Sequence, residues 1–107
     1  MPSDVEKILN ELKLGLARIH GDRLKALYLF GSFARGEGRL PNSDIDVMVV
    51  MHGDFNYRDV ENRSINFVSA LCLTHDVVIM CHFITDDQFA QSKIPFMRNV
   101  RREAVSV

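Results

Sequence analysis

The chain has 107 residues, 47% of them hydrophobic, and a formal net charge of −1. This length predicts one domain, residues 1–107, with a single core. The balanced charge argues against a protein that holds duplex nucleic acid by phosphate neutralisation alone, which requires a basic face. No segment approaches the ~20 apolar residues of a membrane span. Polar residues interrupt the N-terminal segment where a signal peptide would be apolar, so we expect a cytoplasmic location.

The first third of the chain predicts a helix followed by a buried strand. A helix over about Asp4–Ile19 is indicated by apolar residues at helical spacing: Val5, Ile8, Leu9, Leu12, Leu16 and Ile19. The apolar run Leu24–Phe30 has the length of a strand. Gly31 then permits a tight turn, and a short helix from Ser32 would point its N-terminal amides at a bound phosphate.

The rest of the chain alternates in the same way. We expect strands over about Asp44–His52 and Asp76–Phe83, with a helix over about Tyr57–Leu73 between them. A short helix over Asp86–Gln91 and a last helix beginning near Pro95 follow. The predicted fold class is α/β (α+β), a small mixed β-sheet with flanking helices.

Two carboxylates open the second predicted strand. Asp44 and Asp46 alternate with apolar residues, so both project from the same face, with Cα atoms roughly 6.5–7 Å apart. Acids held this close repel each other, and a divalent cation removes that cost. Mg²⁺ prefers one or two carboxylates plus the phosphates of a substrate. The alternative, a solvated edge of a sheet, fits poorly with two acids at the head of an apolar strand.

Two motifs carry a resemblance to a known family. Gly-Ser-x-x-Arg-Gly begins at Gly31, and Ser-Asp-x-Asp begins at Ser43. Together they resemble the signature of the nucleotidyltransferase superfamily that includes DNA polymerase β, above all its minimal nucleotidyltransferase (MNT) branch. The resemblance covers nearly the whole chain and implies the palm fold of that superfamily. Eleven residues separate Ser32 from Asp44, one more than in the usual MNT pattern, and a solvent-type loop absorbs such an insertion cheaply.

The resemblance also implies a site for a nucleoside triphosphate, with ATP as substrate and two Mg²⁺ ions. It assigns nucleotide binding to Gly31, Ser32, Arg35 and Ser43. It assigns catalysis and metal binding to Asp44, Asp46 and Asp76. Asp76 would be the general base that accepts a proton from the attacking hydroxyl. The alternative for Asp76 is a turn acid at the entry to a strand, where Asp is common.

The arginines have two interpretations each. Arg35 lies three residues beyond Ser32 and could contact phosphate, or it could be a surface arginine paired with Glu37. A basic stripe near the C-terminus consists of Arg98, Arg101 and Arg102. A solvated helix face is the default for such a stripe, and contact with nucleic acid or an acidic partner is the alternative.

Histidines and cysteines do not indicate a metal centre. His52, His75 and His82 share no ligand spacing, so zinc is not expected. Cys72 and Cys81 lie in apolar surroundings without CxxC spacing, which predicts buried free thiols rather than a disulfide.

The resemblance implies a protein partner. Larger members of the superfamily add a second domain that binds the acceptor, whereas only about thirty residues follow Asp76 here. We therefore expect the acceptor to be large and to bring its own binding surface. MNT proteins typically pair with a HEPN ribonuclease as antitoxin and toxin, and can transfer AMP from ATP to a tyrosine of that partner. The implied reaction is Mg²⁺-dependent adenylyl transfer to a protein hydroxyl.

Two alternatives stay open. A non-catalytic antitoxin would neutralise its partner by binding, with nucleotide as a regulatory ligand or absent, although the full set of acids argues against it. An enzyme acting on a small molecule or an RNA end would work at an interface between subunits. Homo-oligomerisation of the isolated chain across Phe96–Val107 would favour that second alternative.

Overall fold

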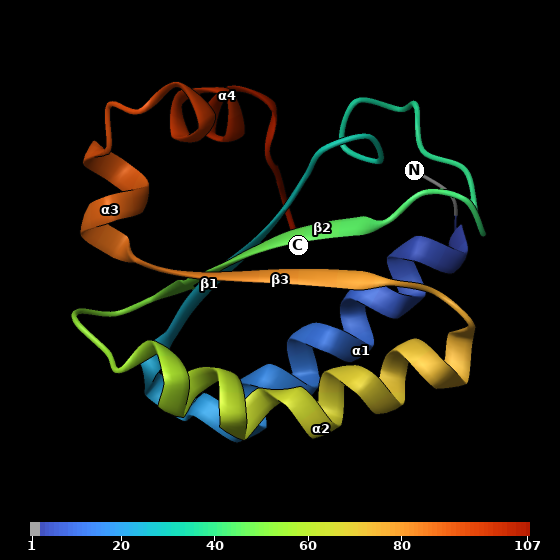
Figure 1. Cartoon of the computed structure of the whole chain (residues 1–107), viewed down its shortest axis with the longest axis horizontal. Coiled ribbons are helices and arrows are strands. Elements are labelled where there is room, and N and C mark those ends of the chain that lie inside the picture. Colours follow the sequence, from blue (N-terminus) through green and yellow to red (C-terminus); the bar gives the residue numbers. More distant parts are fainter. Residues whose placement is uncertain (1–2) are drawn as a thin grey trace.

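In the computed structural model, which describes residues 3–107, helices cover both faces of one β-sheet (Figure 1). The elements in chain order are α1 (Ser3–His20), the 3-10 helix η1 (Gly21–Arg23), β1 (Leu24–Phe30), β2 (Ile45–Met51), α2 (Tyr57–His75), β3 (Ile79–Thr85), α3 (Asp86–Gln91), α4 (Pro95–Glu103) and β4 (Val105–Ser106). The predicted bounds of β1 and α3 are confirmed. Across residues 3–107, every helix is too short or too polar to cross a membrane.

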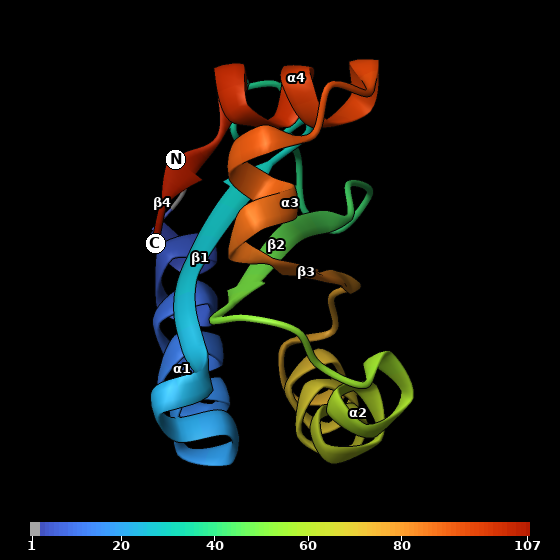
Figure 2. The same cartoon turned by 90° about the vertical axis from the view of Figure 1, so that its left-hand side faces the viewer.

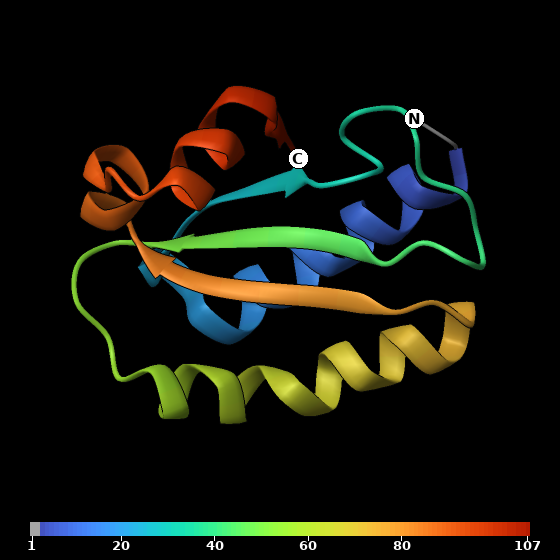
Figure 3. The same cartoon turned by 45° about the horizontal axis from the view of Figure 1, so that its top comes forward.

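The sheet is mixed, as predicted. Its strand order is β3-β2-β1-β4. β1 pairs antiparallel with both β2 and β4, whereas β2 pairs in parallel with β3 after the crossover through α2. β3 therefore forms one edge of the sheet, below β2 in Figure 3, and β4 forms the other.

Each face of the sheet has its own apolar core, because successive side chains along a strand point to opposite faces. α1 and α2 cover one face, and α3 and α4 cover the other (Figures 1 and 2). The core beneath α1 and α2 includes Leu12, Leu16, Leu29, Ile45, Val47 and Val49. The smaller core beneath α3 and α4 consists of Phe30, Met48, Val50, Met97 and Val100. Asp46, between Ile45 and Val47, thus faces the α4 side.

α1 and α2 are joined by a buried polar contact as well as by apolar packing. His20 Nε2 lies 2.8 Å from Ser64 Oγ, and the Ser64 hydroxyl donates to the Val60 carbonyl at 2.8 Å. Because that hydroxyl has only one hydrogen, His20 Nε2 must be the donor to Ser64. Burial and the nearby arginines Arg23 and Arg63 lower the pKa of His20. This favours the neutral imidazole, with its hydrogen on Nε2.

The boundary between α2 and β3 differs from the prediction. α2 continues to His75, and Asp76 ends it in the left-handed region with φ of 52°. Val77 N–H then donates to the Cys72 carbonyl at 3.0 Å, and β3 begins only at Ile79. The prediction that a strand begins at Asp76 is therefore wrong. Within the described residues, Cys72 and Cys81 are free and partly buried.

Candidate active site

The end of β1 lies directly beside a carboxylate of β2. Phe30, the last residue of β1, pairs with Asp46 across the antiparallel ladder. Gly31 follows with φ of 77°, a conformation that side chains rarely adopt. A Cβ at Gly31 would lie 2.5 Å from Oδ2 of Asp46. Only glycine therefore lets the backbone after β1 approach this carboxylate so closely.

The segment after Gly31 is a series of turns, and the predicted short helix from Ser32 is absent there. Arg35 N–H donates to the Gly31 carbonyl at 3.2 Å. The Ser32 carbonyl accepts from Glu37 N–H at 2.9 Å and from Gly38 N–H at 3.2 Å. These backbone hydrogen bonds hold residues 31–38 in a compact loop. Ser32 itself is half-buried.

Asp44 and Asp46 lie at the start of β2, close enough for their charges to interact. Asp44 precedes the strand and is exposed, whereas Asp46 is half-buried. Burial is the main cause that raises the pKa of Asp46, and the Asp44 carboxylate raises it further. His82 and Arg35 are near enough to lower that pKa in part. The carboxylates of Asp44 and Asp46 therefore carry an electrostatic cost that a cation would relieve.

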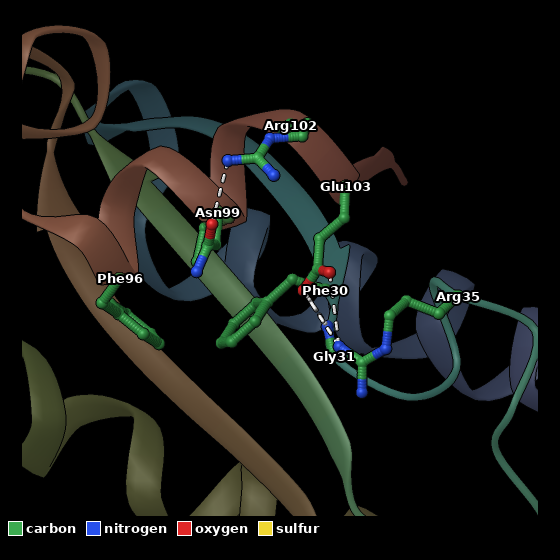
Figure 4. Close-up of a pocket in the computed structure, with 8 residues that line it drawn as sticks. Phe30, Gly31, Arg35, Phe96, Asn99, Arg102 and Glu103 are labelled. Atoms are coloured by element: carbon green, nitrogen blue, oxygen red, sulfur yellow. Dashed lines mark hydrogen bonds and ion pairs between the residues drawn. The ribbon is translucent and has the colours of Figure 1, made fainter.

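Arg35 contacts two carboxylates, those of Glu37 and Glu103, and Figure 4 shows the contact with Glu103. Nε donates to Glu37 at 2.8 Å, which confirms the pairing that the sequence offered as one alternative. Nη1 donates to both carboxylate oxygens of Glu103, at 3.3 Å each. Glu103 also accepts from the Gly31 N–H at 3.2 Å. These hydrogen bonds raise the pKa of Arg35, so the guanidinium stays charged.

Ser43 closes the loop ahead of Asp44. Its hydroxyl accepts from Arg39 N–H at 2.9 Å, and its own N–H donates to the Arg39 carbonyl at 2.8 Å. The side chain thereby fixes the approach of the chain to β2.

Asp76 does not join the other two acids. It is exposed and ends α2, two residues before Val78, whose carbonyl accepts from Ile45 N–H at 2.9 Å. In the parallel register, the β3 residue opposite Asp46 is Met80. Within residues 3–107, no group of three or more His, Cys, Asp or Glu side chains is placed to hold a metal ion. Asp76 lies at the same end of the sheet as Asp44, but outside a cluster with it.

Side chains of α4 and β3 that no sequence motif marks also lie at this site. His82 of β3 lies near Asp46 and packs edge-on against Phe30, with ring centroids 5.4 Å apart. A cavity of about 490 Å³ lies beside Gly31 and Arg35. Its other lining residues are Phe30, Phe96, Asn99, Val100, Arg102 and Glu103 (Figure 4). No local motif marks Glu103, which reaches the site because β4 returns beside β1 and pairs Val105 with Leu29.

A glycine turn at the end of β1 thus lies beside two acids, one just before β2 and one within it. The model of the nucleotidyltransferase domain family matches residues 6–97. The chain belongs to this family. It is 34% identical, over 100 residues and 92% of each chain, to Putative protein adenylyltransferase MJ0604 of Methanocaldococcus jannaschii.

Solved structures share the fold at low sequence identity. A crystal structure of a toxin-antitoxin with AMP-PNP aligns with a TM-score of 0.58 and 19% identity, over 89% of this chain and 68% of that chain. A putative nucleotidyltransferase from Sulfolobus solfataricus aligns with a TM-score of 0.54 and 22% identity, over 99% of this chain and 86% of that chain. A mutant of the toxin-antitoxin MntA-HpeT aligns at 0.56 and 19% identity, over 89% and 68%.

Proposed function

We propose that this nucleotidyltransferase moves AMP from ATP to a hydroxyl group of a protein partner, as the antitoxin of a toxin–antitoxin pair in the cytoplasm. The observation that carries the proposal is the close approach of the Gly31 backbone to the Asp46 carboxylate, because a glycine turn there would cradle a phosphate beside an acid that could hold a metal. The relation to a protein named for adenylyl transfer supports AMP as the group transferred. The shared fold with a toxin–antitoxin structure that contains AMP-PNP supports ATP as the nucleotide and a toxin as the protein partner. The resemblance of the sequence motifs implies that this partner is of the HEPN type.

The acidic residues at the start of β2 fit a magnesium site. Asp44 and Asp46 would hold Mg²⁺, which prefers one or two carboxylates together with substrate phosphates. Their mutual repulsion and the burial of Asp46 are the features that favour a cation there. When bound, the metal would supply charge stabilisation for the attacking and leaving oxygens.

The other residues of the site would bind and orient the triphosphate. Ser32 and the backbone beside Gly31 would contact the phosphates, and Arg35 would add a permanent positive charge. Ser43 would hold the loop that leads to Asp44. In the transfer step, the acceptor oxygen forms a bond to the α-phosphorus. The bond from the α-phosphorus to the oxygen that bridges to the β-phosphate breaks, and pyrophosphate leaves with the electron pair of that bond.

Asp76 is the proposed acceptor of the proton that the hydroxyl loses. This role requires Asp76 to come within about 3 Å of the attacking oxygen. Its exposed position at the end of α2 gives it access to a large acceptor that docks against this end of the sheet.

A second candidate function has one observation in its favour. Within the described residues, Asp76 forms no three-acid cluster with Asp44 and Asp46. A protein that neutralised its partner by binding alone would need no base at this position. Nucleotide would then be a regulatory ligand of the same turn.

Label transfer distinguishes the two functions. The protein, Mg²⁺ and ATP labelled at the α-phosphate are incubated with the HEPN-type protein encoded by the neighbouring gene. We expect label on the partner, reduced about a hundredfold or more by Asp46→Asn, because the lost charge stabilisation amounts to several kcal/mol. The matched control Asp54→Asn removes an exposed acid after the opposite end of β2 and should transfer normally.

The variant Asp76→Asn tests the proton acceptor in the same assay. Lost transfer in a folded variant that still binds Mg·ATP supports catalysis through Asp76. Full transfer by this variant removes Asp76 from the mechanism. Absence of transfer by the unmodified protein, with its partner still neutralised, supports the binding function.

A further inference from the structure

Glu103 is distant in sequence from the turn that begins at Gly31, but its side chain lies beside that turn. It is the last residue of α4, and the chain turns there into β4, which pairs with β1 through Val105 and Leu29. Its carboxylate accepts from the Gly31 N–H at 3.2 Å and from Arg35 Nη1 at 3.3 Å. One side chain thus bonds the first amide of the turn and the guanidinium at its end.

The two carboxylates on Arg35 differ in their surroundings. The Glu37 side chain is 61% exposed, whereas that of Glu103 is 25% exposed. An exposed ion pair is worth little, because water screens it and side-chain entropy opposes it. A partly buried, charge-assisted bond that also holds a backbone amide fixes geometry more strongly. Glu37 makes the shorter contact, at 2.8 Å, but Glu103 is the partner that ties Arg35 to the backbone of the Gly31 turn.

The contacts leave one side of the guanidinium available. Nε is bonded to Glu37 and Nη1 to Glu103. Among the described residues, Nη2 donates to no hydrogen-bond partner. Arg35 is also close enough to Asp46 to lower the pKa of that carboxyl. A guanidinium tied to the Gly31 turn through Glu103 thus keeps the two N–H donors of Nη2 for an anion near Asp46.

We propose that Glu103 is a positioning residue for nucleotide binding: it holds the Gly31 turn and Arg35 so that Nη2 of Arg35 faces a phosphate of the triphosphate. The inference rests on the proposed function, because it assigns a role at the same site. It makes α4 part of the nucleotide-binding structure. The opposing possibility is that the Glu103 carboxylate occupies the place of a phosphate and competes with the nucleotide.

The affinity of the full chain for AMP-PNP with Mg²⁺ tests this role by calorimetry. Glu103→Ala should weaken binding about tenfold. This is the effect expected when Arg35 loses about one net hydrogen bond to the nucleotide. Glu103→Gln, which keeps one oxygen acceptor but loses the charge, should fall between this variant and the unmodified protein. The matched control Glu37→Ala removes the exposed partner of Arg35 and should change affinity by less than about threefold.

A double mutant distinguishes positioning from a general loss of stability. If Glu103 acts through Arg35, then Arg35→Ala and Arg35→Ala with Glu103→Ala should bind equally weakly. Unchanged or tighter binding by Glu103→Ala overturns the proposal, as does a loss that adds in full to that of Arg35→Ala. Should Glu103→Ala not fold, Glu103→Gln decides by the same criteria. Failure of the unmodified protein to bind Mg·AMP-PNP overturns the proposed function and this inference together.

Discussion

The surroundings of Asp46 disfavour the charged form of its carboxyl group. The residue is half-buried, with the Asp44 carboxylate nearby and the backbone of Gly31 against its Oδ2. Its pKa is raised in the folded protein relative to the ordinary value, mainly by burial. A group with a raised pKa favours folding in its protonated form and opposes folding once ionised. At neutral pH, the charge on Asp46 therefore costs stability.

We expect Asp46→Asn to raise the melting temperature of the metal-free protein at neutral pH, because the variant removes that charge. The gain should disappear as pH falls below the ordinary Asp value, where both folded and unfolded protein carry a protonated Asp46. Thermal unfolding of both proteins across this pH range measures the difference. A lower melting temperature for Asp46→Asn at neutral pH would contradict this account.

At the scale of single elements, the contact between α1 and α2 depends on one serine. Ser64→Ala removes the acceptor of the buried His20 Nε2–H and leaves that donor unpaired. We expect a loss of about 1–3 kcal/mol in the free energy of unfolding, the usual cost of an unsatisfied buried polar group. Urea denaturation measures it. Ser69→Ala changes an exposed serine on the same helix and should be as stable as the unmodified protein or slightly more stable, because Ala has the higher helix propensity. An equal loss in this variant would contradict the assignment of the Ser64→Ala loss to the unpaired His20.

Elements with a clear local pattern could be predicted from the sequence, but the boundary between α2 and β3 could not. The apolar period of α1 and the strand at Leu24–Phe30 are confirmed because local burial decides both. The apolar run after Asp76 predicts a strand that begins at this residue. In the structure the same residue ends a helix in the left-handed region, which a short polar side chain tolerates.

The residues of the candidate site also differ in whether a local sequence pattern indicates them. The alternation of Asp44 and Asp46 with apolar residues is local, so their common face could be read from the sequence. Glu103 reaches Gly31 only through the pairing of β4, an element of two residues without a sequence pattern of its own. The position of His82 beside Asp46 depends on the parallel register of β2 and β3, which no local signal specifies.

For the whole molecule, two cores on opposite faces separate stability from the site. Leu12 is a fully buried residue of α1 and belongs to the core on the face away from the site. Val100 is a buried residue of α4 and lines the cavity beside Gly31. Leu12→Ala should cost about 2–5 kcal/mol of stability and leave the affinity of the folded protein for Mg·AMP-PNP unchanged.

Val100→Ala should lower both stability and affinity, because it loosens the helix that carries Glu103. Denaturation and calorimetry on the two variants at the same temperature make the comparison. Equal losses of affinity in both variants would show that the two faces do not act separately.

The antiparallel pairing of Phe30 with Asp46 has a consequence for how this protein can be varied. The hydrogen-bonded ladder of β1 and β2 sets the distance between the glycine turn and the acidic strand. The length of the intervening loop therefore does not determine this distance. Residues can be added to or removed from the outer part of that loop without moving either end of the site. Loop length and chemical geometry are thus independent variables. A segment that recognises a new acceptor could be grafted there while the reacting groups keep their places.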